Sequence, residues 1–220
     1  MKTIAIVSGG MDSVTLAYYL KSQGHDLHLV SFNYNQRHKK EIDFAIQNAV
    51  LLEVPHSIVD LSTVGAFLKG SSLTDNIDVP DGHYAEDSMR ITVVPNRNAI
   101  MLAIAYGIAV AEKADAVAIG NHAGDHFIYP DCRPEFVDSF RIMQNIAIGD
   151  FGSVDLLAPF TSITKANIVS IGTEINVPYA LTWSCYKGKQ HHCGQCGTCV
   201  ERKEAFELAH VEDPTVYRPD

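Results

Sequence analysis

Short apolar runs alternate with stretches of helical periodicity along most of the chain. Five apolar runs predict strands, at residues 3–7, 26–32, 57–61, 114–119 and 154–157. The first of these runs is branched or small throughout and predicts a strand buried on both faces. Helical spacing of apolar residues predicts helices at residues 12–21, 40–52, 97–113, from 134 onward and 164–174. This alternation predicts an α/β fold with a doubly wound, parallel, five-stranded sheet.

Two polar segments and a cysteine-rich region interrupt the alternation. Residues 62–92 and 120–133 are irregular and rich in Gly, Asp and Asn. Loops of this length inside a compact domain are usually lids or binding loops. The alternation stops near residue 176, and a last helix is predicted at residues 200–209. We therefore predict a main domain at residues 1–175 and a small C-terminal segment at residues 176–220.

The composition is that of an ordinary globular protein and narrows the range of partners. Apolar residues make up 46% of the chain and charged residues 20%, which argues against a disordered, collagen-like or coiled-coil protein. Lys and Arg number 17 against 26 Asp and Glu, a net charge of −9. Because nucleic-acid binding relies on phosphate neutralisation, we expect no direct nucleic-acid partner.

Nothing in the apolar runs suggests a membrane or a secretory signal. The longest apolar stretch, residues 99–111, is shorter than the roughly 20 residues that span a bilayer. The apolar run after the first three residues is too short for a signal-peptide core. We therefore expect a cytoplasmic protein in a reducing compartment, where disulfides are unlikely to form.

The sequence Ser-Gly-Gly-Met-Asp-Ser at residues 8–13 lies between the first predicted strand and the first predicted helix. Glycines here allow positive φ and close backbone approach to a ligand, and the helix N-terminus offers free N–H groups. Such a nest binds phosphates, although two adjacent glycines also suit a plain strand-to-helix turn. The spacing is that of neither the Walker-type nor the dinucleotide-binding glycine loop. The candidate phosphate-binding residues are Ser8, Gly9, Gly10, Met11, Asp12, Ser13 and Val14.

Four of the five cysteines lie close together in the chain, as Cys185, Cys193, Cys196 and Cys199. In a reducing compartment such a cluster favours a metal over disulfides. Four thiolates at about 2.3 Å form a closed, structural zinc site. An iron–sulfur cluster and a redox-active C-x2-C pair are the alternatives, and His191 and His192 are competing ligands. Cys132 stands apart and is interpreted as a loop residue or core filler.

The glycine loop resembles the pyrophosphate loop of the ATP-pyrophosphatase superfamily, whose members cut ATP between the α and β phosphates and adenylate a substrate. From end to end, the chain is similar to the 7-cyano-7-deazaguanine synthase family. The motifs that carry this likeness are the loop at 8–13, Phe-Asn-Tyr-Asn-Gln-Arg-His at 32–38, Val-Pro-Asn-Arg-Asn at 94–98, Tyr-Pro-Asp-Cys-Arg at 129–133, Lys165 and the four-cysteine segment. A departure is Asn96, where many members have glycine.

This resemblance implies an adenine nucleotide alpha hydrolase-like domain followed by a four-cysteine zinc-binding segment. It implies conversion of 7-carboxy-7-deazaguanine and ammonia to 7-cyano-7-deazaguanine, through an acyl adenylate and an amide, with release of AMP and pyrophosphate. The expected cofactors are ATP with Mg²⁺ and structural zinc, and the expected assembly is a homodimer. The product would feed queuosine- or archaeosine-type biosynthesis. Since no amidotransferase module is visible, free ammonia or a partner must supply the nitrogen.

The motif residues receive provisional roles because ligands of such sheets bind at the carboxyl ends of the strands. Arg97 and Lys165 are assigned to phosphates and to developing negative charge. The candidate substrate-binding residues are Tyr34, Arg37, Asp125, Asp131 and Arg133. Either aspartate can accept hydrogen bonds from a guanine-like edge, and Tyr34 or Phe32 can stack on a base. His38, His122 and His126 are candidate proton carriers, although loop histidines are usually polar surface.

Three other functions share parts of this pattern. A tRNA-thiolating or tRNA-lysidine-type enzyme would add an RNA-binding domain and positive charge, which this chain lacks. A related enzyme that stops at the amide, or that attaches the deazaguanine to another molecule, shares the first half-reaction. A nucleotide sensor or zinc adaptor shares the fold class but leaves the loop cations unexplained.

Overall fold

The computed structural model describes residues 1–218, so the last two residues of the predicted segment 176–220 lie outside it. At its centre is a five-stranded sheet in the order β3-β2-β1-β4-β5, and every neighbouring pair is parallel. The strands are β1 Lys2–Ile6, β2 Asp26–Asn33, β3 His56–Asp60, β4 Ala116–Ala118 and β5 Asp155–Leu157. The fold class predicted from the sequence is confirmed.

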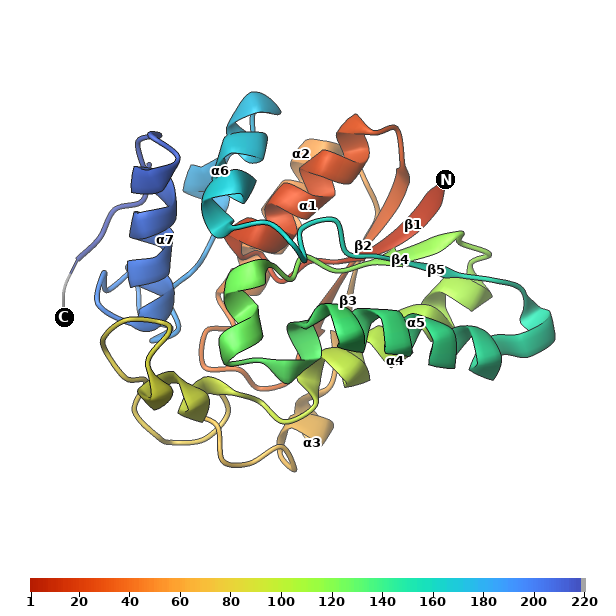
Figure 1. Cartoon of the computed structure of the whole chain (residues 1–220), viewed down its shortest axis with the longest axis horizontal. Coiled ribbons are helices and arrows are strands. Elements are labelled where there is room, and N and C mark those ends of the chain that lie inside the picture. Colours follow the sequence, from red (N-terminus) through yellow and green to blue (C-terminus); the bar gives the residue numbers. More distant parts are fainter. Residues whose placement is uncertain (219–220) are drawn as a thin grey trace.

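Helices cover both faces of this sheet (Figure 1). One face carries α1 Met11–Ser22, α2 Glu41–Leu52 and α6 Lys165–Glu174. The other face carries α4 Arg97–Ala111 and α5 Pro134–Ile148. The last helix, α7 Gly197–Leu208, stands beside α6, and α3 Ser62–Gly65 is a single turn. The sheet is therefore doubly wound, as the alternating pattern predicts.

Local sequence sets where three of these helices begin. The Thr164 hydroxyl accepts the backbone N–H of Asn167 and caps α6, which makes Lys165 the first helical residue. Pro134 opens α5, where its missing N–H costs nothing. Asn96 precedes α4 with a φ of 56°. Asparagine tolerates this left-handed conformation better than most residues, so Asn96 suits the position before the helix.

A hydrophobic core lies on each face of the sheet, and the C-terminal segment contributes to both. On the α4 and α5 face, the buried side chains include Phe32, Tyr106 and the four clustered cysteines. On the α1 and α6 face they include Leu16 and Phe160, together with Phe206 from α7. The segment that follows residue 176 is thus packed into the same cores as the strands.

A buried arginine anchors the end of the described chain. The Arg202 side chain is fully buried, and its guanidinium donates to both carboxylate oxygens of Asp213 at 3.1–3.2 Å. It also donates to the Thr182 hydroxyl at 2.7 Å and to the carbonyl oxygen of Tyr179 at 3.0 Å. The Tyr217 hydroxyl donates to the same aspartate at 2.5 Å. These bonds tie two stretches of the C-terminal segment, residues 179–182 and 213–217, to α7.

The structure differs from the sequence-based expectation mainly at element boundaries. Helix α7 begins at residue 197, three residues before the predicted start at 200, and so includes Cys199. The irregular segment 62–92 contains α3 and a 3-10 helix, Asp87–Thr92. Both are short turns without a continuous apolar face, so periodicity gives no sign of them. Within residues 1–218, no helix is both long enough and apolar enough to cross a membrane.

Candidate active site

A cavity of about 230 Å³ opens at the carboxyl ends of β1 and β4. These strands are neighbours, yet the chain reaches β4 only after placing β2 and β3 on the other side of β1. Such a reversal leaves a crevice that binds ligands in open α/β sheets. The cavity is lined by the glycine loop, by the starts of α4 and α6, by the loop after β4 and by the C-terminal segment.

The glycine loop is held in one conformation by its own groups and by two neighbouring segments. Gly9 has a φ of +98°, and a Cβ there would lie 1.9 Å from the carbonyl oxygen of Glu41, so only glycine fits. The Ser13 hydroxyl donates to the carbonyl of Gly10 at 3.1 Å, and the N–H of Trp183 donates to that of Gly9 at 2.9 Å. The predicted loop residues that line the cavity are Ser8, Gly10, Met11, Asp12 and Ser13, whereas Gly9 and Val14 do not.

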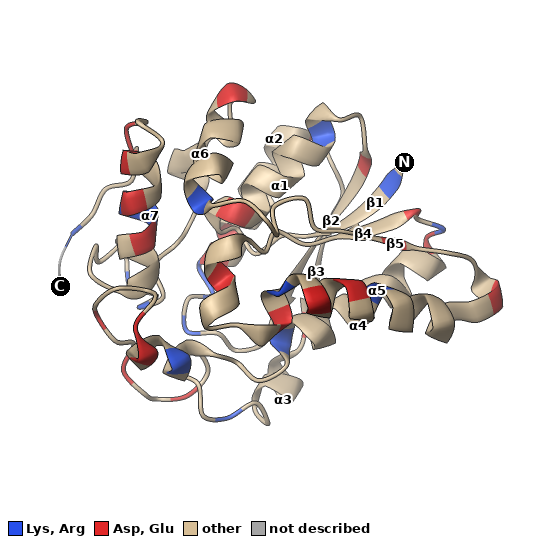
Figure 2. Ribbon diagram, in the orientation of Figure 1, with Lys and Arg blue, Asp and Glu red and all other residues tan. Residues whose placement is uncertain are grey.

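Lys165 lies at the centre of a charged cluster beside this loop. Its ammonium group donates a hydrogen bond to Glu201 Oε2 and lies 3.2 Å from Asp12 Oδ2. Burial opposes the charge on Lys165, but Asp12, Glu201 and Asp125 outweigh it and raise the pKa of the amine far above its usual range. Three carboxyl groups thus face one ammonium. Figure 2 shows the same juxtaposition, with a basic start of α6 beside an acidic start of α1 and an acidic α7.

His122 lies under the charged cluster, buried and restricted to one tautomer. Its Nδ1 accepts the backbone N–H of Gly124 at 3.1 Å, which assigns the proton of the neutral ring to Nε2. Nε2 lies 3.7 Å from Asp125 Oδ1, 3.7 Å from Glu201 Oε1 and 3.9 Å from Asp12 Oδ2, and it has no hydrogen-bond partner among the described residues. The Gly124 N–H therefore fixes the orientation of the ring and turns Nε2 towards the three carboxyl groups.

Arg97 lies in a second region of the cavity, where its neighbours include tyrosines. Its guanidinium donates to the Tyr34 hydroxyl at 3.5 Å and, within residues 1–218, forms no salt bridge. Tyr129 and Tyr186 also line this region. Burial raises the pKa of all three phenols, so they remain neutral hydrogen-bonding groups. A half-buried guanidinium without a carboxylate partner is suited to binding an anion.

Two of the four cations singled out in the sequence lie outside the cavity lining. Arg37 donates to the carbonyl oxygens of Asp75 and Ile77 at 3.0 and 2.8 Å. Arg133 is exposed and donates to the carbonyl oxygen of His126 at 3.0 Å. In this structure both guanidinium groups donate hydrogen bonds to loop carbonyl groups, and neither lines the cavity.

The two candidate aspartates are also placed differently from one another. Asp125 lines the cavity, and its Oδ2 accepts the backbone N–H of His122 at 3.0 Å. Asp131 lies outside the lining, and its Oδ2 accepts the N–H of Asn98 in the first turn of α4 at 3.0 Å. Cys132, also in this loop, is buried at the cavity wall, and burial raises the pKa of its thiol.

Several lining residues received no role from the sequence, and some of them belong to the C-terminal segment. Trp183, Tyr186, Thr198 and Glu201 all face the cavity. Glu201 is the most informative of these, because it bonds the predicted Lys165. Its only sequence signal is its position two residues after Cys199, and an acidic residue on a late helix otherwise suggests a solvated face.

The four clustered cysteines form a compact, buried thiol site. Their Sγ atoms lie within 4.8 Å of one another, and Cys185 and Cys196 Sγ are 4.0 Å apart. Thiolates around a tetrahedral zinc ion would be about 3.8 Å apart, given Zn–S distances of about 2.3 Å. The backbone N–H groups of Gln195 and Cys196 donate to Cys193 Sγ at 3.4 and 3.3 Å. The donor set, its spacing and its burial fit a metal ion of the zinc type.

Solved structures with this fold include enzymes of distant sequence. The chain is similar to the NMN synthetase from Francisella tularensis, with a TM-score of 0.51 at 17% identity over 96% of this chain and 77% of the other. It is also similar to the U34-tRNA thiolase NcsA from Methanococcus maripaludis, described with its [4Fe-4S] cluster. There the TM-score is 0.50 at 16% identity over 100% of this chain and 76% of the other. At such identities the likeness concerns the fold alone.

Much closer relatives match the chain over nearly its whole length. It is 61% identical to a 7-cyano-7-deazaguanine synthase of Brucella anthropi over 99% of this chain and 94% of that protein. It is also 61% identical to the 7-cyano-7-deazaguanine synthase of Rhizobium rhizogenes over 100% of this chain and 94% of that protein. The model of the family described as queuosine biosynthesis protein QueC matches residues 2–210, and the chain belongs to this family.

Proposed function

We propose that this protein is an ATP-dependent carbon–nitrogen ligase that converts 7-carboxy-7-deazaguanine and ammonia to 7-cyano-7-deazaguanine. The observation that carries the proposal is one cavity with a preformed phosphate loop, the ammonium of Lys165 and the guanidinium of Arg97. Relatives at 61% identity carry the corresponding name. The substrate is a free base, which suits an acidic protein without a surplus of phosphate-binding cations.

The first half of the reaction turns a poor electrophile into a good one. The substrate carboxylate oxygen attacks the α phosphorus of ATP, and the bond to pyrophosphate breaks, leaving an acyl adenylate. Ammonia then attacks the acyl carbon, AMP leaves, and one proton is released with formation of the amide. The glycine loop would bind the pyrophosphate portion, and Lys165 and Arg97 would stabilise negative charge as it develops.

The second half removes the amide oxygen with another ATP. The amide oxygen attacks the α phosphorus, pyrophosphate leaves, and the product is an adenylated imidate. The amide nitrogen loses its protons as the C–O bond breaks, so AMP departs and the nitrile remains. Tyr34, Phe32 and Asp125 line the cavity and would hold the deazaguanine ring.

Two metal ions fit residues of this chain. Asp12 has a buried Oδ1 that finds no hydrogen-bond partner in the part of the chain that the structure describes, and with Asp125 it would hold the Mg²⁺ that accompanies ATP. The surplus of carboxyl groups around Lys165 favours a cation at this position. Mg²⁺ neutralises phosphate charge when bound. Zinc on the four cysteines would hold the C-terminal segment in its folded form.

The proposal is tested by product analysis. The purified protein is incubated with ATP, Mg²⁺, ammonium and 7-carboxy-7-deazaguanine, and the products are identified by mass spectrometry. We expect the nitrile, with two AMP and two pyrophosphate per nitrile. Formation of ADP and phosphate would overturn the assignment of the glycine loop. Accumulation of amide without nitrile would instead identify an enzyme that stops halfway.

The assembly we propose is a homodimer, as expected from the sequence resemblance. Supporting it, α5 and the turn after it leave a row of apolar side chains exposed, Ile142, Met143, Ile146 and Phe151. Such a patch is unusual on a monomer. Sedimentation analysis of the wild type and of Ile146→Glu measures the point directly, and a monomeric wild type would contradict it.

A further inference from the structure

Among the cavity residues, Glu201 has a carboxylate whose position is fixed by buried neighbours on its own helix. It lies on the first half of α7, and its side chain is about one-tenth exposed. Two residues before it is the clustered Cys199, and one residue after it is the fully buried Arg202. The backbone that carries Glu201 is therefore fixed on both sides, by the cysteine site and by the arginine network.

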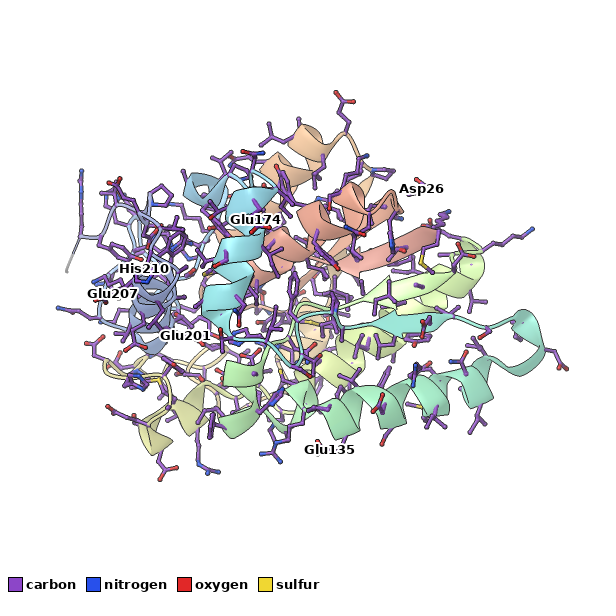
Figure 3. The ribbon with its side chains drawn as sticks, turned by 45° about the horizontal axis from the view of Figure 1, so that its top comes forward. Asp26, Glu135, Glu174, Glu201, Glu207 and His210 are labelled. Carbon is purple, nitrogen blue, oxygen red and sulfur yellow. The ribbon has the colours of Figure 1, made fainter. Side chains whose placement is uncertain are left out.

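The carboxylate of Glu201 is enclosed by groups of the loop after β4 and by Lys165. Oε2 accepts the hydrogen bond of the lysine ammonium, and Oε1 lies 3.7 Å from His122 Nε2. A Cβ on Gly124 would lie 2.9 Å from His122 Cε1 and 3.2 Å from Glu201 Oε1, so a larger residue at this position would crowd both side chains. In Figure 3, Glu201 lies on the side of α7 that faces the start of α6, whereas Glu207 lies away from it.

The lysine has no comparable support from its own helix. Lys165 is the first residue of α6, and its long side chain would otherwise sample many rotamers at considerable entropic cost when ordered. Asp12 Oδ2, at 3.2 Å, supplies one contact, but Asp12 belongs to the phosphate loop and is also the carboxylate proposed to hold Mg²⁺. Once Asp12 binds Mg²⁺, Glu201 is, among the residues that the structure describes, the remaining carboxylate that forms a salt bridge with the ammonium group.

We propose that Glu201 is the positioning residue of Lys165, and that through it the cysteine-bound segment sets the geometry of the phosphate site. Glu201 keeps the ammonium group of Lys165 aimed into the cavity before ATP arrives, so the lysine needs no reorganisation during the reaction. The metal site then has a catalytic consequence without contacting any reactant, because the helix that carries Cys199 also carries Glu201. The kinetic part of this inference rests on the proposed function, and the spectroscopic part does not.

The first test uses variants of the whole chain in the assay described above. Glu201→Gln preserves shape and removes the charge, and we expect kcat to fall about tenfold or more, a part of the loss typical for a missing charge-stabilising group. KM for ATP should change much less. Glu201→Asp, which restores the charge at shorter reach, should recover part of kcat. The matched control is Glu207→Gln, an exposed glutamate on the same helix, which should behave as wild type.

A double-variant comparison separates positioning from a purely structural role. If Glu201 acts through Lys165, adding Glu201→Gln to Lys165→Ala should cause no further loss of kcat. Losses that multiply in full would overturn the inference, and so would a Glu201→Gln enzyme with wild-type kcat. A wild-type protein that makes no product would instead refute the proposed function. The two failures are therefore distinguishable.

The second test reads the lysine directly and needs no substrate. Reductive ¹³C-methylation followed by NMR titration reports the pKa of Lys165, identified by its loss in Lys165→Ala. The charged and titratable groups that face the amine are Asp12, Asp125, Glu201, His122 and Tyr84. We expect Glu201→Gln to lower this pKa and Glu207→Gln to leave it unchanged. An unchanged titration in Glu201→Gln contradicts the inference, and Glu201→Asp serves the same measurement if the glutamine variant does not fold.

Discussion

The two cationic regions of the cavity solve the problem of buried charge in opposite ways. Lys165 is in contact with carboxyl groups from α1 and α7, whereas Arg97 lies among tyrosine hydroxyls and forms no salt bridge in the described part of the chain. An ion cluster in a cavity is already compensated and changes partners when a ligand arrives. An uncompensated guanidinium gains its first anionic partner from the ligand. The first region is therefore suited to charge that moves during a reaction, and the second to an anion that is simply held.

The largest effect should come from removing the amine of the compensated region. Lys165→Ala should lower the rate of nitrile formation by about 10²–10³, the usual cost of losing a group that stabilises charge in the transition state. The amide is a weaker nucleophile toward ATP than the carboxylate, so the second activation should suffer more. Timed mass spectrometry should find the amide accumulating. Nitrile formation at the normal rate would make this lysine a bystander.

Replacement of Lys165 and replacement of Arg97 should have different effects on the stability of the protein. Lys165→Met leaves the carboxylates of Asp12 and Glu201 without their cation and should lower the free energy of unfolding by on the order of 3 kcal/mol. Arg97→Met removes a charge that has no carboxylate partner and should change it by less than about 1 kcal/mol. Denaturant titration of both variants without ligand measures the contrast. Equal destabilisation would show that the two regions are not built differently.

Helix α7, which carries Glu201, should be destabilised by a substitution outside the cavity. Asp213→Ala deprives the buried Arg202 of its carboxylate and should cost about 2–3 kcal/mol of stability at pH 7. Burial opposes ionisation of Asp213, but Arg202 outweighs it and lowers the pKa of this carboxyl. A lowered folded-state pKa contributes stability above the unfolded value of about 4 and loses it as pH falls through the folded value. Urea titrations should thus find the wild type and the variant converging below about pH 4.

A small effect on stability is also expected for Asp131, in the loop beside the start of α4. Asp131 accepts the N–H of Asn98 at the start of α4, so Asp131→Ala should remove a helix-capping contact worth about 1 kcal/mol. If the aspartate has only this role, KM for the deazaguanine substrate should stay close to the wild-type value. A rise in KM of tenfold or more would restore Asp131 as a substrate-binding residue.

The sheet and its helices were predictable because their signals are local. Branched apolar runs mark the strands, and residues such as Thr164 and Pro134 mark helix starts within a few positions. The glycine loop was equally accessible, since a strand, two glycines and a helix follow one another directly. Likewise, the spacing of the cysteines predicts that they converge, and their sulfur atoms do lie together.

The rest of the site depends on contacts between distant parts of the chain. Arg37 belongs to the motif at residues 32–38 and was predicted to bind substrate. Its hydrogen-bond partners are the carbonyl groups of residues 75 and 77, in a segment without apolar periodicity. Glu201 reaches Lys165 from 36 positions away. No propensity or spacing rule reports which of several acidic residues on α7 turns inward, because that choice is made by packing against α6 and by the buried neighbour Arg202.

The hydrogen bond from Trp183 to the glycine loop has a consequence for the order in which the protein is made. All five strands precede residue 183 in the chain, so they leave the ribosome first and can begin to fold there. The part of the cavity lining that includes Trp183, Tyr186 and Glu201 is translated later. A nascent chain therefore carries the nucleotide fold before it carries a closed site, and an unfinished enzyme would lack the groups needed to consume ATP productively.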